Sequence, residues 1–239
     1  MENLGYLVLL MIVNFLLITF AYRNFGKNGL FIYIAVSVIA ANIQVNKFVH
    51  YIDIGNFSID ATLGNVMFGG IFLATDLLSE KYGKKTALKS VYYSIFANLA
   101  FVAVMVLASL FTAFNADEFT TSFNASFQML FSANSNMVKA VILGNIVYFI
   151  SQSLDVRLYS KIMSWLPGNK YLWVRNNGST IVSQTVDTFL VTFFFALAGI
   201  FPFEFFWGVI VSTMFVKLLV ALLDTPFLYL MNYIKPKAE

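Results

Sequence analysis

The chain has 239 residues, of which 59% are hydrophobic and 11% are charged, and its formal net charge is +3. Soluble domains are about 25% charged, so this composition excludes a globular protein with a fully water-covered surface. The chain contains no cysteine, which excludes disulfides, thiolate catalysis and cysteine-ligated metals.

Long uninterrupted apolar runs occupy most of the chain. A helix needs about 20 apolar residues to cross the hydrocarbon core of a bilayer, and continuous runs favour helices over the alternating pattern of a membrane barrel. We therefore predict a single all-α transmembrane domain over residues 1–239, built as a bundle of about seven helices. In chain order the predicted spans are residues 4–22, 29–49, 57–79, 86–114, 137–163, 174–201 and 205–233.

The basic residues predict how the bundle is oriented. Most of the 15 basic residues follow the first, third, fifth and seventh spans: Arg23, Lys27, Lys81, Lys84, Lys85, Lys89, Lys161, Lys170, Lys235 and Lys237. The other loops contain the acidic residues Asp53, Asp117, Glu118 and Glu204. Because positively charged loops tend to remain in the cytoplasm, we expect the N-terminus outside and the C-terminus in the cytoplasm, in the cell (inner) membrane.

The connector between the fourth and fifth spans, residues 115–136, has a pattern of its own. Its large apolar residues recur at helical spacing, with Thr, Ser, Asn and Gln between them: Phe119, Phe123, Phe127, Leu130 and Phe131. This pattern predicts an amphipathic helix on the outer membrane surface. We favour an interfacial connector, and a lid over an entry path is the alternative.

Ionisable side chains inside a membrane span are costly and usually face a cavity or a partner. They are therefore the first candidates for function. By position along the chain they are Asp76 in the third span, Asp155 and Arg157 in the fifth, Arg175 and Asp187 in the sixth, and Lys217 and Asp224 in the seventh. Further candidates for function are uncharged or lie at the end of a span: Asn42, Asn46, Lys47 and Asn98.

The fifth and sixth spans carry the same motif, S-Q-x-x-D, at residues 151–155 and 183–187. At 1.5 Å per residue, Gln152 and Gln184 both lie roughly 15 Å from the cytoplasmic helix ends, near mid-bilayer, and Asp224 lies at a similar depth. A carboxylate accepts paired N–H bonds and a carboxamide offers a donor and an acceptor. The motifs predict a site for a nucleobase-like or amide-bearing solute. The alternative is that they only hydrogen-bond the helices together.

Nothing in the sequence indicates an enzyme. There is no phosphate-binding loop, nucleophile elbow or metalloprotease motif, and His50 is the only histidine. We expect no catalysis, no cofactor, no metal and no nucleic-acid partner, and an intramembrane enzyme is the disfavoured alternative. ATP could drive transport only through another subunit.

Several segments resemble a known family. Residues 75–85, TDLLSEKYGKK, resemble the T-D-L-x-x-E-x-Y-G signature of the queuosine precursor transporter family, which is also described as a vitamin uptake transporter type. Residues 173–180 and 183–188 resemble further segments of that family, and so do Asn42 and Lys47. The resemblance covers about residues 40–230.

The resemblance implies import of deazaguanine precursors of the modified tRNA nucleoside queuosine. A guanine-like edge needs a carboxylate facing its two N–H groups and a donor facing its carbonyl, and an aromatic ring can stack on the base. The candidate substrate-binding residues are Asp155 and Asp187 for the N–H groups, Gln152, Asn177 and Gln184 for the carbonyl, Trp173 or a nearby Phe for stacking, and Asp224 at the same depth.

Charged and polar residues outside this predicted binding site are candidates for a role in transport. Residues near the cytoplasmic ends are expected to form a gate, or to anchor the helices beside the headgroups: Asp76, Glu80 and Arg175. The other transport candidates are Asn42, Lys47 and Lys217. The family is similar in size to the substrate-binding subunits of energy-coupling-factor transporters. We expect a stand-alone carrier, with such a subunit for a vitamin-like solute as the alternative, and a homodimer as one expected assembly.

Overall fold

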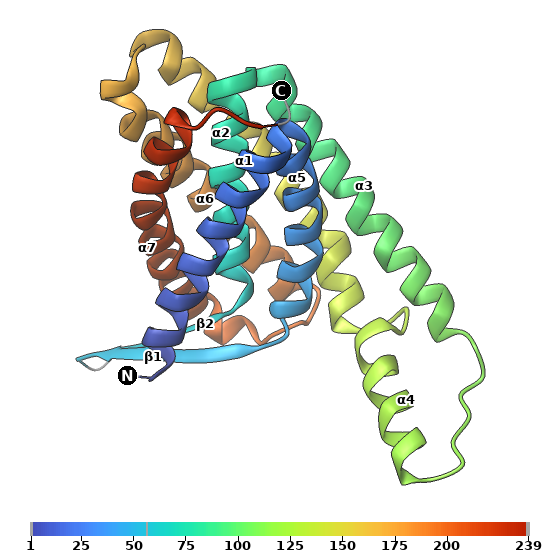
Figure 1. Ribbon diagram of the computed structural model, residues 1–239. Coiled ribbons are helices and arrows are strands. Elements are labelled where there is room, and N and C mark those ends of the chain that lie inside the picture. The colour runs from blue at the N-terminus through green and yellow to red at the C-terminus, as the bar shows by residue number, and fades with distance from the viewer. Residues whose placement is uncertain (1, 56, 238–239) are drawn as a thin grey trace.

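The computed structural model describes residues 2–55 and 57–237 as a bundle of long helices with one β-hairpin (Figure 1). The helices are α1 (Glu2–Gln44), α2 (Gly64–Tyr82), α3 (Lys84–Ser109), α4 (Glu118–Phe131), α5 (Asn136–Trp165), α6 (Leu172–Leu197) and α7 (Phe206–Tyr233), and the strands are β1 (Phe48–Ile54) and β2 (Phe57–Thr62). Two short 3-10 turns precede α6 and α7, at Asn169–Tyr171 and Phe203–Phe205. Among the described residues, five helical segments are long and apolar enough to cross a membrane. The predicted mainly helical membrane protein is confirmed.

Helix α1 consists of two arms that run in opposite directions. They meet at Gly26, whose φ of 56° and ψ of −140° are not helical and suit a residue without a Cβ atom. Figure 1 shows the chain rising through the first arm and returning through the second to the hairpin. The two arms are joined by a hydrogen bond from the Tyr33 hydroxyl to the Asn14 side chain. They correspond to the first two predicted spans, although the second arm ends at Gln44 and not at Val49.

The β-hairpin corrects the predicted third span, which was placed at residues 57–79. Residues 57–62 form strand β2, paired antiparallel with β1, and the helix begins only at Gly64. The reason is a short alternation of apolar and polar residues, the period of a half-buried strand. Ile59 and Ala61 face the bundle and are buried, whereas Ser58 and Asp60 between them are exposed.

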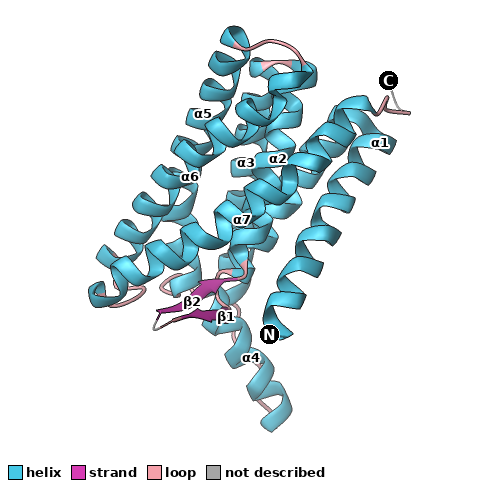
Figure 2. Cartoon of the chain, turned by 90° about the vertical axis from the view of Figure 1, so that its left-hand side faces the viewer, coloured by secondary structure: helices cyan, strands magenta, loops and turns pink. Residues whose placement is uncertain are grey.

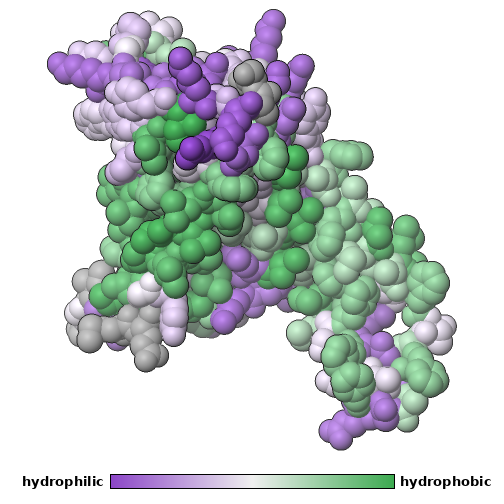
Figure 3. Space-filling model, viewed as in Figure 1, coloured by the Kyte–Doolittle hydropathy of each residue, from purple (hydrophilic) through white to green (hydrophobic). Residues whose placement is uncertain are grey.

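Helix α2 is the centre of the bundle. It packs against α1, α3, α5, α6 and α7, and most of its residues from Gly64 to Ser79 are buried. The surrounding helices expose large apolar side chains outward, among them Phe20, Phe96, Leu107 and Leu222. In Figure 3 these outward faces form an apolar belt between more polar ends. A water-soluble monomer rarely exposes so large an apolar surface, so the belt fits contact with lipid.

The loops rich in basic residues gather at the end of the bundle opposite the hairpin, which is the purple upper end in Figure 3. The backbone N–H of Lys237 donates to the carbonyl of Arg23 at 2.9 Å, and Lys81 donates to the carbonyl of Asn232. At the other end, the Asn3 side chain donates to the carbonyl of His50 in β1 at 2.8 Å. The two ends of the described chain therefore lie at opposite ends of the bundle (Figure 1).

Helix α4 occupies the connector for which an amphipathic helix was expected. Its N-terminus has a capping box, in which Asp117 accepts from the Thr120 backbone N–H at 2.8 Å, and these hydrogen bonds hold the pKa of the Asp117 carboxyl below its usual value. Phe127 and Phe131 pack against α3 and α5, whereas Phe119 remains exposed. Figures 1 and 2 show α4 extending beyond the bundle at the same end as the hairpin.

Candidate functional site

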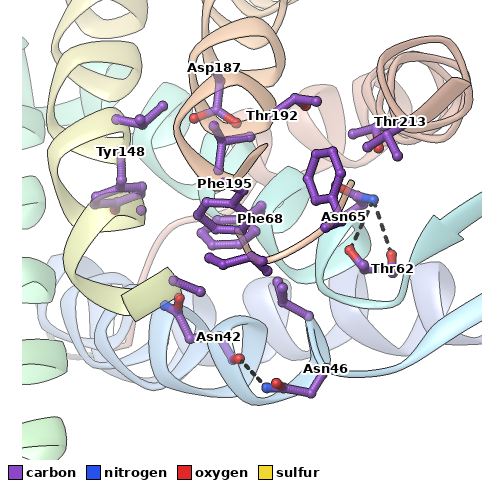
Figure 4. Close-up of a pocket in the computed structure, with 18 of the residues that line it drawn as sticks. Asn42, Asn46, Thr62, Asn65, Phe68, Tyr148, Asp187, Thr192, Phe195 and Thr213 are labelled. Atoms are coloured by element: carbon purple, nitrogen blue, oxygen red, sulfur yellow. Dashed lines mark hydrogen bonds between the residues drawn. The ribbon is translucent and has the colours of Figure 1, made fainter. Parts of the chain in front are cut away.

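A cavity of about 260 Å³ lies in the hairpin half of the bundle. Its walls come from the second arm of α1, the ends of the two strands, α2, α5, α6 and α7, and the loop before α7. Figure 4 shows labelled side chains from these elements arranged around it. None of the lining residues belongs to α4, so that helix does not cover the cavity in this conformation.

The cavity walls combine aromatic rings with carboxamides. Phe68 of α2, Tyr148 of α5 and Phe195 of α6 supply flat apolar surface, and the rings of Phe68 and Tyr148 lie 6.4 Å apart. Asn42 and Asn65 face the same space, and each donates its amide N–H to a backbone carbonyl nearby, Val38 at 2.8 Å and Thr62 at 3.0 Å. These hydrogen bonds fix the orientation of the carboxamides, which suits recognition of a flat polar molecule.

An ion pair lies at the inner end of the cavity. Lys217 of α7 donates to Asp187 of α6 at 2.6 Å, and Ser151 of α5 donates to the other carboxylate oxygen of Asp187 at 2.8 Å. The side chain of Lys217 is 2% exposed and that of Asp187 is 17% exposed, so the carboxylate is the more accessible partner. The pair offers a planar molecule an acceptor and a cationic donor at neighbouring positions.

The two S-Q-x-x-D motifs contact each other reciprocally. Ser151 of the first motif donates to Asp187 of the second at 2.8 Å, and Ser183 of the second donates to Asp155 of the first, also at 2.8 Å. Helices α5 and α6 run antiparallel, so each serine lies opposite the aspartate of the other helix. The motifs therefore meet, as their depth predicts, but their aspartates face different surroundings: Asp187 lines the cavity and Asp155 does not.

The other six predicted substrate-binding residues lie outside the cavity lining. Four are almost fully buried between helices: Gln152, Asp155, Gln184 and Asp224. Gln152 accepts from Thr75 at 3.1 Å, and Asp224 accepts from Asn176 at 2.8 Å. These four side chains lie in the contacts between helices, so the structure does not bring them together with Asp187 around the cavity.

Two further candidates lie near the basic end. Asn177 donates to Thr225 of α7 at 2.8 Å, and Trp173 is 55% exposed in the first turn of α6. Neither lines the cavity. Trp173 or a nearby Phe was expected to stack on the base, and the aromatic residues that line the cavity are Phe48, Phe68, Tyr148, Phe195 and Phe201.

The residues expected to form a gate are partly joined. Arg175 of α6 pairs with Glu80 of α2 at 2.9 Å and donates to the carbonyls of Leu166 and Gly168, both at 2.9 Å. Tyr159 of α5 donates to the other oxygen of Glu80 at 2.7 Å. This cluster joins α2, α5 and α6 at the basic end. Asp76, which was expected in the same gate, lies deeper and is fully buried.

The remaining transport candidates divide between the cavity and the surface. Asn42 and Lys217 line the cavity, whereas Lys47 is exposed in the turn before β1. Arg157 is exposed on α5, and Asn98 of α3 donates to Asn145 of α5 at 3.2 Å. Sequence reasoning missed Asn65, Phe68 and Tyr148, because uncharged residues within apolar spans carry no signal that separates a cavity wall from ordinary packing.

An apolar belt around the helices and a cavity between them that contains charged, amide and aromatic side chains are features of a multi-pass membrane transporter. A family model described as "Putative vitamin uptake transporter" matches residues 62–231. A curated protein of Bacillus subtilis (strain 168), the "Probable queuosine precursor transporter", is 38% identical over 240 residues, which cover 100% of this chain and 99% of that relative. No solved structure matches the chain significantly. The chain belongs to the vitamin uptake transporter family and is a multi-pass protein of the cell membrane.

Proposed function

We propose that this chain is a carrier that imports a queuosine precursor, a planar deazaguanine base, into the cell. The observation that carries the proposal is the cavity itself, in which a carboxylate, an ammonium group, carboxamides and aromatic rings surround one small space. Full-length similarity to the queuosine precursor transporter of B. subtilis supports the choice of substrate.

The cavity groups match the edge of a guanine-like base. Asp187 is the acceptor for the paired N–H groups, and Lys217 is the donor for the carbonyl oxygen. The base lies between Phe68, Tyr148 and Phe195, whose rings supply stacking surface. Cavities for drug-sized ligands measure about 300–1,000 Å³, so a volume of about 260 Å³ suits a single bicyclic base.

We infer seven membrane crossings, made by the two arms of α1 and by α2, α3, α5, α6 and α7. The gathering of basic loops at one end supports a cytoplasmic location for that end, with the hairpin and α4 outside. In this orientation the cavity lies on the outer side, and the cluster of Glu80, Arg175 and Tyr159 closes the inner side. The structure then corresponds to an outward-facing state of an alternating-access carrier.

The cavity and the closing cluster belong to one chain, which supports a stand-alone carrier without catalytic activity. Uptake into vesicles that contain only this protein tests this assignment. We expect the purified wild type to equilibrate a labelled pre-queuosine base across the vesicle membrane without ATP. Uptake only when ATP and a co-purified ATPase are supplied would favour the energy-coupling-factor subunit.

The site is tested with Asp187→Asn, which keeps the size of the side chain and removes its charge. Because a hydrogen bond to a charged group contributes about 1.5–3 kcal/mol, binding of the pre-queuosine base should weaken by roughly 10- to 100-fold. Asp53→Asn, a change on the exposed hairpin, is the matched control and should bind like the wild type. Equal affinities of the two variants would remove Asp187 from the site.

A further inference from the structure

Two carboxyl groups face each other beneath the inner end of the cavity. Asp76 of α2 and Asp155 of α5 are both 0% exposed, and their carboxyl groups are within hydrogen-bonding reach of each other. Both oxygens of Asp76 have no hydrogen-bond donor, and neither does Oδ2 of Asp155. We call this pair the carboxyl pair.

The side chains that the structure describes supply no counterion to the carboxyl pair. In the described part of the chain the buried basic side chains are Lys217 and Arg175, which are paired with Asp187 and Glu80. Two unpaired carboxylates that lie close together repel each other, and burial has removed the water that would stabilise their charges. One proton held between them removes one charge and creates a donor for the other oxygen.

The ionisable groups around Asp76 increase the need for that proton. The carboxyl groups of Asp155 from α5, Asp224 from α7 and Glu80 from its own helix surround Asp76. Tyr159 of α5 is neutral and donates its hydroxyl to Glu80. From α6 comes Arg175, which is engaged by Glu80. The charged residues of α1 and α3 whose side chains are described are exposed at helix ends: Arg23, Lys27, Lys84, Lys85 and Lys89.

The layer around the carboxyl pair contains further unmatched polar atoms. Gln152, one turn before Asp155, accepts from Thr75 next to Asp76, but its own amide Nε2 is buried without an acceptor. The hydroxyl of Ser79, one turn after Asp76, is also buried without a partner. Buried polar groups in folded proteins are nearly always paired. The unpaired atoms in this layer therefore indicate that it binds a further group, such as a proton, or changes its hydrogen-bond partners.

The carboxyl pair lies between the cavity and the closing cluster. On α5, Ser151, Asp155 and Tyr159 follow at intervals of four residues and share one helix face. Ser151 bonds to Asp187 in the cavity, and Tyr159 bonds to Glu80 in the closing cluster. A change of charge at the carboxyl pair therefore acts on α5, the helix that contacts both the cavity and the closing cluster.

We propose that Asp76 and Asp155 form a proton-binding site that couples import of the substrate to entry of a proton. The proposal rests on the proposed function and assigns its driving ion. In the outward-facing state the carboxyl pair holds one proton taken from outside. Release of that proton to the cytoplasm leaves two carboxylates, whose repulsion separates α2 from α5, and uptake of the next proton from outside restores the pair.

The test uses the purified protein in sealed vesicles and a labelled pre-queuosine base. With one proton carried per base, a gradient of one pH unit, acid outside, should raise the inside-to-outside ratio of the base about tenfold. Addition of unlabelled base should also acidify the vesicle interior, which a trapped pH dye records. Asp76→Asn and Asp155→Asn should retain binding and exchange of labelled for unlabelled base but lose gradient-driven accumulation, while Asp53→Asn should accumulate it like the wild type.

The outcomes separate this inference from the proposed function. Uptake that does not depend on the pH gradient, or that depends on a sodium gradient, would overturn the proton site. The proposed carrier function would still hold. If the wild type neither binds nor transports the base, the infrared spectrum decides the proton site without substrate. A C=O stretch of a buried protonated carboxyl group that disappears in Asp76→Asn, or in Asp155→Asn if the first variant fails to fold, supports the proposal. Absence of that band from the wild type overturns it.

Discussion

At the scale of single residues, the reciprocal serine contacts show how one motif serves two purposes. Ser151 and Ser183 each hold the aspartate of the opposite helix, so α5 and α6 are joined at two levels. One of these aspartates then faces the cavity and the other faces Asp76. The motif is therefore both an interhelical contact, which was the alternative considered from sequence, and a support for the candidate site.

These contacts predict a loss of stability when either serine is removed. Ser151→Ala removes a donor from a partly buried oxygen of Asp187, and Ser183→Ala removes the nearer donor from a buried oxygen of Asp155, which keeps only Thr180 at 3.5 Å. Each change should lower the free energy of unfolding by about 1–3 kcal/mol. Ser164→Ala, which removes an exposed hydroxyl bonded within its own helix, should change it little. Thermal unfolding in detergent measures the difference. Unfolding temperatures equal to that of the control would contradict the role of these hydrogen bonds.

The sequence indicated some residues of the candidate site and not others, for a physical reason. Asp187 and Lys217 could be identified because a charged group within a membrane span is costly and therefore conspicuous. Phe68 and Tyr148 could not, because aromatic residues are common on every face of a membrane helix. Depth along the helices placed Gln152, Gln184 and Asp224 at one level, but depth does not specify which side of a helix is open.

At the scale of whole elements, the helices were predictable because each depends on a long apolar run. The hairpin was not, because its second strand is short and continues directly into the apolar sequence of α2. The alternation of apolar and polar residues over 57–62 is the only local sequence pattern that predicts the hairpin. The second arm of α1 was predicted too long for the same reason, since Phe48 and Val49 are apolar but belong to strand β1.

The close approach of α2 and α7 depends on a glycine. A Cβ atom at Gly69 would overlap the side chain of Val220, which is fully buried in α7. Gly69→Ala should therefore destabilise the bundle by about 1–3 kcal/mol through overpacking. Gly208 lies in α7 with open space around it, so Gly208→Ala should be neutral or stabilising by up to about 1 kcal/mol. Thermal unfolding that gave both variants the same stability would contradict this packing.

At the scale of the whole molecule, the polar groups form three layers along one path. The cavity with Asp187 and Lys217 lies toward the hairpin, the carboxyl pair lies beneath it, and the closing cluster lies at the basic end. Helices α2, α5 and α6 contribute to more than one layer. A small movement of these helices relative to one another therefore changes both the cavity and the closing cluster. This arrangement suits a carrier that opens to one side at a time.

In the proposed carrier the cavity opens outward and contains the substrate. Cysteine labelling can examine both properties, because the native chain has no cysteine. Thr213→Cys places a thiol in the cavity wall, and Ser164→Cys places one at the basic end. In intact cells an impermeant maleimide should label Thr213→Cys, more slowly when the pre-queuosine base is present, and should label Ser164→Cys only after permeabilisation. Labelling of Ser164→Cys from outside would refute the proposed orientation, and a labelling rate at Thr213→Cys that the base does not change would refute the binding site.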